Sequence, residues 1–240
     1  MDLKIQPFLY EDSLVFTVTS DGYKYYTWNL YKLLQELKVP WKLCILCLDR
    51  ESFDFMNKIA MIPSRLYLMP GQHIHHKDPV IFGSQQFKRM NRMKLKALEE
   101  LSQRPEVKTL LFLDSDIAPF QDPLLSVKQF LETCPLWFQC DEKQENLFVC
   151  SSPDTCPNPC TGVIAMSLTE EMRPIYKDVY RIVDDVWKDS LTDQDYVFKR
   201  LQSTQTSYKT LDRRQFPNGI FLAENRYKEG NPVLLHFNYI

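Results

Sequence analysis

Glycine is scarce in this 240-residue sequence, which contains only six glycines. None of them forms a Gly-x-Gly-x-x-Gly or Walker pattern, the glycine-rich loops whose backbone N–H groups cradle phosphate. If the protein binds a phosphorylated ligand, a metal ion and cationic side chains must therefore take over that role.

The sequence also lacks a long apolar run and a strong excess of charge. No stretch approaches the ~20 apolar residues of a membrane span, and the start Met1-Asp2-Leu3-Lys4 does not resemble a signal peptide. A formal net charge of -2 gives no reason to expect a nucleic-acid partner. We expect a cytoplasmic protein, or a domain excised from a longer chain, with no membrane segment.

Regular disulfide or metal-ligand spacing is missing as well. Seven cysteines is an odd number and no Asn-x-Ser/Thr glycosylation site occurs, which favours a reducing compartment. Cys44 and Cys47 lie three apart in an apolar run, so on a strand they point to opposite faces and are expected in the core. Two metal or disulfide sites remain as weaker alternatives, one among Cys140, Cys150, Cys156 and Cys160 and one among His73, His75 and His76.

What the sequence does contain is a series of apolar runs that alternate with segments of helical apolar spacing. Strands are expected at 14–18, 43–48, 64–69, 109–113, 136–140, 147–150, 161–166 and 233–238. Helices are expected around 30–37, over 84–102, after Thr169 with a face from Ile175 to Val186, and from about 193. Alternating strands and helices are typical of an α/β fold with a doubly wound sheet, and we see no linker or repeat that would divide the chain.

The most informative stretch is 109–120, where an apolar run leads directly into Asp114, Ser115 and Asp116. The run predicts a strand buried on both faces, and Pro119 prevents its continuation as a central strand. Ligands bind at the carboxyl ends of strands in open α/β sheets, and two carboxylates there suit a divalent cation that holds a diphosphate. The alternative is a turn in which Asp and Ser make local hydrogen bonds.

Three further polar residues have both a structural and a functional interpretation. Lys94 lies inside the apolar stripe of the helix 84–102, where it either snorkels along its stem or aims its charge at the carboxylates or a bound phosphate. Asp195, three residues after Thr192, fits a capping box. His236 in the last apolar run is by default a core residue, although its place at the end of a strand permits a role as a metal ligand.

Taken together, these motifs resemble the nucleotide-diphospho-sugar transferases, metal-dependent glycosyltransferases of the GT-A fold. The resemblance covers roughly 14–238 and looks most like the branch with plant cell-wall xylosyltransferases and viral relatives. It rests on an ordered set of short motifs: Thr19-Ser20-Asp21-Gly22-Tyr23, Lys94, Leu113-Asp114-Ser115-Asp116, Asp122-Pro123-Leu124, Thr161-Gly162, Asp193-Gln194-Asp195, Phe216-Pro217-Asn218-Gly219 and His236-Phe237-Asn238.

The resemblance implies a single GT-A domain with a Rossmann-like, twisted, mostly parallel sheet flanked by helices. A nucleotide-binding half would span about 1–120 and an acceptor half about 121–240. It implies Mn²⁺ or Mg²⁺ as the cofactor, a UDP-sugar donor and a glycan acceptor. The implied site residues are Asp114, Asp116 and His236 for metal, Thr19, Ser20, Tyr23, Lys94, Asp114 and Ser115 for the nucleotide diphosphate, and Asp193 and Gln194 beside the reacting carbon.

The chain departs from the family pattern at two points. Cys160 stands where members usually have Asn before Thr-Gly, so a sugar or acceptor contact can differ there. The Gly-x-x-Lys that often follows the final histidine does not occur before Ile240, which leaves open a longer, multidomain chain.

Chemistry supports the same function, because a divalent ion and a buried cation stabilise a departing diphosphate and a carboxylate such as Asp193 serves as a base or as charge support. Two other functions stay open on the sequence alone, a catalytically silent sugar-binding domain and an Asp-x-Asp phosphatase.

Overall fold

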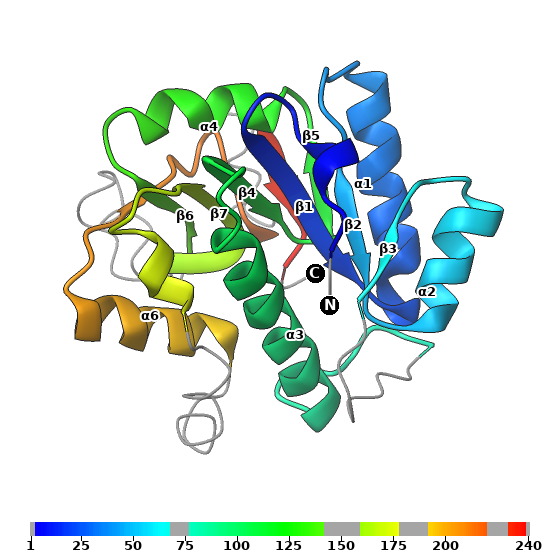
Figure 1. Cartoon of the computed structure of the whole chain (residues 1–240). Coiled ribbons are helices and arrows are strands. Elements are labelled where there is room, and N and C mark those ends of the chain that lie inside the picture. Colours follow the sequence, from blue (N-terminus) through cyan, green and yellow to red (C-terminus); the bar gives the residue numbers. More distant parts are fainter. Residues whose placement is uncertain (1–2, 68–76, 142–158, 178–191, 220–229, 239–240) are drawn as a thin grey trace.

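The computed structural model describes residues 3–67, 77–141, 159–177, 192–219 and 230–238 (Figure 1). Within these residues the main sheet has the strand order β3-β2-β1-β4-β7-β6-β8, and β5 and β9 form a small second sheet. The strands are β1 (Ser13–Thr19), β2 (Cys44–Cys47), β3 (Arg65–Leu66), β4 (Thr109–Leu113), β5 (Ile117–Pro119), β6 (Leu136–Cys140), β7 (Pro159–Ser167), β8 (Lys209–Thr210) and β9 (Leu234–His236).

The main sheet is mixed but mostly parallel. β1, β2, β3 and β4 run in one direction, β7 is antiparallel to both β4 and β6, and β8 is parallel to β6. The chain therefore forms one α/β domain of the predicted class. From β1 the chain continues to β2 and β3 on one side of the sheet, and β4 then pairs with the other side of β1. The carboxyl ends of β1 and β4 therefore lie at the topological switch point, where ligands are expected to bind.

Helices cover both faces of this sheet (Figure 1). The described α-helices are α1 (Lys24–Glu36), α2 (Arg50–Asp54), α3 (Gln85–Ser102), α4 (Pro123–Leu131) and α6 (Asp193–Thr204). Shorter 3-10 turns are η1 (Gln6–Phe8), η2 (Asp21–Tyr23) and η5 (Arg173–Tyr176), and a π-helical turn, η3 (Phe55–Ile59), continues α2.

Alternating side chains of the central strands supply two cores. Leu14 and Phe16 of β1 belong to the core that includes α3 and α6, whereas Val15 belongs to the core that includes α1 and α4. Cys44 and Cys47 are divided between these same two cores, so the prediction that they are core residues on opposite faces is confirmed.

Polar caps explain where the helices begin. Ser84, Asp122 and Thr192 each accept a hydrogen bond from a backbone N–H in the first turn of α3, α4 and α6, which satisfies donors that have no partner inside the helix. At α6 the cap is a complete capping box with Asp195, as the sequence predicts.

Some sequence predictions differ from the structure. The segment after Thr169 forms a turn and the short η5 instead of starting a regular helix, because Pro174 has no N–H and suits only the first turn of a helix. The short strands β5 and β8 were not predicted. The strand at 147–150, the three loop histidines, Cys150, Cys156 and the helix face beyond Tyr176 lie outside the described residues.

Candidate active site

A cavity of about 630 Å³ opens at the carboxyl ends of β1 and β4. Elements that are distant in sequence contribute to it: the end of β1, one face of α3, the end of β4, the start of β7, the first turn of α6 and the end of β9. Among the predicted site residues, those that line the cavity are Tyr23, Lys94, Asp114, Ser115, Asp116, Asp193, Gln194 and His236. Thr19 and Ser20 are not among the lining residues, and both are fully buried at the end of β1.

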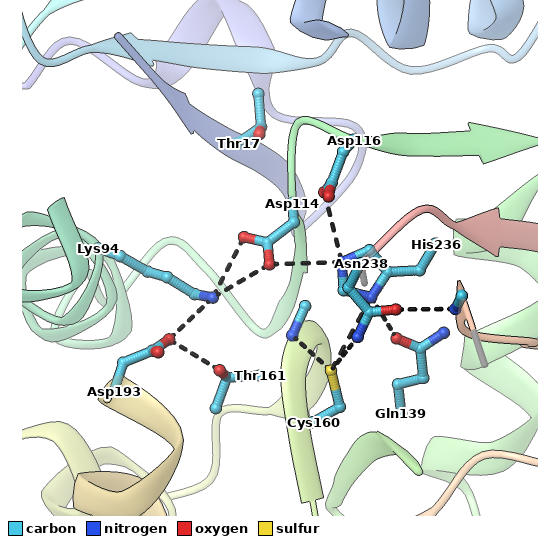
Figure 2. Close-up of polar contacts among 12 residues, drawn as sticks. Thr17, Lys94, Asp114, Asp116, Gln139, Cys160, Thr161, Asp193, His236 and Asn238 are labelled. Atoms are coloured by element: carbon cyan, nitrogen blue, oxygen red, sulfur yellow. Dashed lines mark hydrogen bonds and ion pairs between the residues drawn. The ribbon is translucent and has the colours of Figure 1, made fainter. Parts of the chain in front are cut away.

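Asp114, Asp116 and His236 form a cluster that could hold a metal ion. One potential ligand atom from each of the three lies within 4.8 Å of the others. Nε2 of His236 is 3.3 Å from Oδ1 of Asp116 and 3.8 Å from Oδ2 of Asp114 (Figure 2). Carboxylate oxygens and an imidazole nitrogen are suitable ligands for Mn²⁺, so the residues present fit the metal that the sequence implied.

The small sheet brings His236 to the two aspartates across 120 positions of sequence. Ile117, directly after Asp116, pairs with His236 in the β5–β9 ladder, and the N–H of Phe237 donates to the carbonyl of Asp116 at 3.1 Å. On the other side, Gly162 packs against the imidazole so closely that a Cβ there would lie 2.1 Å from Cε1 of His236. Glycine at 162 therefore makes room for the histidine.

Lys94 bridges two carboxylates in the cavity. Its Nζ lies 3.1 Å from Oδ1 of Asp114 and 2.9 Å from Oδ2 of Asp193, and the hydroxyl of Thr161 donates to the same Asp193 oxygen at 2.7 Å (Figure 2). The lysine is 5% exposed and its ammonium group also lies 4.5 Å from the centre of the Phe112 ring. Of the alternatives for Lys94, the structure thus supports a charge aimed at carboxylates rather than a snorkelling side chain.

These contacts shift several pKa values. Burial opposes the charged form of Lys94, but Asp114 and Asp193 hold its pKa above the usual range. Burial raises the pKa of Asp114, and the ammonium of Lys94 only partly opposes that shift. Burial also disfavours charge on His236 and Asp116, yet their mutual hydrogen bond raises the pKa of His236 and lowers that of Asp116. A divalent cation bound here would displace the proton that this pair shares.

The first turn of α6 presents Asp193 and Gln194 to the cavity. Thr161 and Lys94 fix the carboxylate of Asp193, and Nε2 of Gln194 donates to Oδ2 of Asp141 at 2.9 Å. Asp195, by contrast, uses its carboxylate to accept the N–H of Thr192 in the capping box.

Sequence reasoning overlooked two polar residues of this region, Asp141 and Gln139. Asp141 lines the cavity and follows β6 just as Asp114 follows β4, so the strand-end rule could have identified it. Gln139 is the polar residue within the otherwise apolar Leu136–Cys140 strand, and it is completely buried beside His236. Cys160, which the sequence marked as a departure from the family, is a buried free thiol in the cavity wall.

Comparison with known proteins identifies the family. Residues 41–240 match the family described as nucleotide-diphospho-sugar transferase. The chain belongs to this family. No curated protein sequence matches the chain.

Solved structures show where the fold recurs. The chain is similar to the apo form of mouse xyloside xylosyltransferase 1, with 12% identity and a TM-score of 0.58 over 94% of this chain and 97% of that one. It is similar to the galactosyltransferase LgtC in complex with donor and acceptor sugar analogs, with 12% identity and a TM-score of 0.57 over 93% and 86% of the chains. It is also similar to the glycosyltransferase GlyE of Streptococcus pneumoniae, with 13% identity and a TM-score of 0.58. That match covers 95% of this chain, which spans only 55% of the length of GlyE.

At this level of identity the likeness establishes the fold, and it is the GT-A fold of glycosyltransferases, as the sequence predicts. Among the described residues, no helix has the length and apolar character needed to span a membrane.

Proposed function

We propose that this member of the family transfers a sugar from a nucleoside diphosphate sugar, with UDP as the nucleotide, to a hydroxyl group of a glycan. The observation that carries the proposal is the convergence of Asp114, Asp116 and His236 in the same cavity as Asp193. Such a cavity combines a site for a cation with a carboxylate for the reacting carbon. An Asp-x-Asp phosphatase has no support from the family match or from the fold.

Asp114, Asp116 and His236 would hold Mn²⁺ or Mg²⁺. When bound, the divalent ion supplies positive charge that stabilises the diphosphate as it departs. Ser115, between the two aspartates, lies in the cavity wall and is proposed to contact the nucleotide.

Lys94 adds a second positive charge to the cavity. Because its ammonium is held by Asp114 on one side and Asp193 on the other, it links the proposed metal site to the proposed reacting carbon. We assign Lys94 to the diphosphate. Tyr23, which lines the cavity, is assigned to the nucleoside together with Thr19 and Ser20, whose buried side chains shape the adjoining end of β1.

Asp193 and Gln194 are assigned to the reacting carbon and the donor sugar. Two contacts to the same oxygen, from Thr161 and Lys94, hold the Asp193 carboxylate in position, and Asp141 orients the amide of Gln194. A fixed carboxylate is ready to act as a base or to support positive charge on the sugar without reorganising during the reaction.

The direct test is turnover of a panel of UDP-sugars in the presence of Mn²⁺, with and without glycan acceptors. Wild-type protein should release UDP from at least one donor. Asp193→Asn should keep UDP affinity and lose at least ~100-fold in turnover, the lower end for a positioned acid–base group. A catalytically silent domain would bind UDP but turn over none of the donors. Near-normal turnover by Asp193→Asn would show that Asp193 has no part in the reaction.

A further inference from the structure

Gln139 is a buried polar residue for which the reaction so far has no use. It lies on β6 with no measurable exposure, where apolar side chains precede it. The pairing of β6 with β7 shifts register between Phe138 and Gln139, a bulge in the ladder. Bulges re-aim side chains next to active sites, and this one directs Gln139 toward His236 (Figure 2).

Contacts on one side determine how the Gln139 amide is oriented. Its Nε2 lies 3.0 Å from the carbonyl oxygen of Phe216 and 3.1 Å from that of Pro217. Carbonyl oxygens only accept hydrogen bonds, so the NH₂ group of the amide must face them. The opposite orientation would bury the amide oxygen against two carbonyl oxygens and remove their side-chain donor, which is unfavourable. The amide oxygen of Gln139 therefore has to face the imidazole.

That orientation in turn determines which nitrogen of His236 carries a proton. Oε1 of Gln139 lies 2.7 Å from Nδ1 of His236, a short distance that requires Nδ1–H to be the donor. The thiol of Cys160 is a poorer competitor for this proton, since its Sγ lies 3.9 Å from Nδ1 and already accepts the N–H of Gly162 at 3.5 Å. In the neutral ring Nε2 then has a free lone pair, and Nε2 is the atom that faces Asp114 and Asp116.

We propose that Gln139 is a positioning residue that holds His236 in the Nδ1–H tautomer and so presents the Nε2 lone pair to a divalent cation between His236 and the two aspartates. The part of this inference that concerns the cation rests on the proposed function. A lone pair directed at two carboxylates is favourable only with a positive charge between them, which is what a metal ion or a proton supplies. Gln139 does not touch the substrate, and it acts through His236 alone.

The first test is the tautomer itself, which needs neither metal nor substrate. Long-range ¹H–¹⁵N spectra of wild-type protein with ¹⁵N-labelled histidine, taken at the alkaline end of a pH titration where the ring is neutral, distinguish the two tautomers. We expect a protonated Nδ1 and an unprotonated Nε2 for His236, assigned by its loss in His236→Ala. A protonated Nε2 overturns the proposal.

The second test uses two variants that differ in one property. Gln139→Leu and Gln139→Glu both lose the NH₂ group that binds the carbonyls of Phe216 and Pro217, but only the Glu variant keeps an oxygen that can accept from Nδ1. Mn²⁺ binding in saturating UDP, followed by the electron paramagnetic resonance signal of free Mn²⁺, should weaken ~10–100-fold in Gln139→Leu. Gln139→Glu should remain much closer to wild type.

Equal losses in the two variants would mean that Gln139 serves only to hold the Phe216–Pro217 segment, and would overturn the proposal. Asn218→Ala provides a control for that segment, because it removes the bond from Nδ2 of Asn218 to the carbonyl of Cys140 and leaves the imidazole contact unchanged. If wild-type protein binds no Mn²⁺, the proposed function fails, whereas the wild-type spectrum still decides which tautomer His236 adopts, and the spectrum of Gln139→Leu decides whether Gln139 sets it.

Discussion

Gly162 illustrates how one small residue permits the arrangement of the proposed metal site. Its carbonyl accepts the N–H of Asp114 at 2.8 Å, and its missing side chain leaves space for the ring of His236. Gly162 therefore contacts both Asp114 and His236, two of the three proposed metal ligands. The sequence identified Thr161-Gly162 as a motif, but the reason for glycine is visible only in the packing.

Gly162→Ala should displace His236, because the new methyl group would lie 2.1 Å from Cε1. We expect a loss of stability of ~1–3 kcal/mol from overpacking and a clear loss of Mn²⁺-dependent UDP binding by calorimetry. Gly230→Ala is the matched control, since its Cβ would lie 2.5 Å from the carbonyl of Arg214, outside the cavity wall. The control should lose stability and keep its affinity for UDP; equal affinities in the two variants would contradict this role of Gly162.

Lys94 is the other residue whose effect can be isolated. Lys94→Met keeps an unbranched apolar stem but leaves Asp193, which is 5% exposed, without its cation. Breaking a buried ion pair from one side is costly, so we expect a loss of about 3 kcal/mol in the free energy of unfolding. Adding Asp193→Asn should recover part of that loss. Urea denaturation measures both variants, and a single variant as stable as wild type would show that the pair adds nothing to the fold.

At the scale of elements, the small sheet positions the site. β9 pairs with β5 immediately after Asp116, so the ladder fixes the distance between His236 and the aspartates more directly than the core does. The N–H of Phe237 extends this ladder by one bond to the carbonyl of Asp116.

Phe237→Pro should therefore weaken Mn²⁺-dependent UDP binding, because proline cannot donate that hydrogen bond. Phe237→Ala is the matched control: the aromatic side chain is 36% exposed, and alanine keeps the N–H. We expect a several-fold larger loss of affinity in the proline variant by calorimetry. Equal losses would indicate that the side chain, rather than the backbone bond, is what matters at this position.

The sequence predicts those elements whose signal is local. The apolar runs of β1 and β4, the apolar stripe of α3 and the capping box at Thr192 are all visible in short windows, and each is confirmed. β5 has three residues and β8 has two, too few to give a periodic signal. η5 replaces a predicted helix start because Pro174 has a stronger effect than the apolar spacing around it.

The residues of the site can be separated in the same way, into those with a local sequence signal and those without one. Asp114, Asp116, Lys94 and Asp193 could be selected from strand ends, an odd charge in an apolar stripe and the family order, and the structure brings them together. Gln139 could not be selected from the sequence, because its orientation depends on a bulge in β6 and on the carbonyls of Phe216 and Pro217, about 80 positions away. Long-range hydrogen bonds of this kind have no local pattern.

At the scale of the whole molecule, the cavity lies where two parts of the chain meet. Val18, Tyr23 and Asp114 come from the half proposed to bind nucleotide, about 1–120, whereas Asp193 and His236 come from the half proposed to serve the acceptor, about 121–240. His236 closes the proposed metal site from the second half, so we propose that donor binding stabilises the contact between the two halves. Thermal denaturation with Mn²⁺ and UDP should accordingly show a higher midpoint than with either alone.

The most direct measurement of the central claim is calorimetry of UDP binding with Mn²⁺ and, separately, with EDTA. If Asp114, Asp116 and His236 hold a cation that carries the diphosphate, UDP should bind ~100-fold more weakly in EDTA, a difference of ~2.8 kcal/mol. Asp116→Ala in Mn²⁺ should reproduce most of that loss. Equal UDP affinity in Mn²⁺ and in EDTA would contradict the account, because the cluster would then have no part in binding the donor.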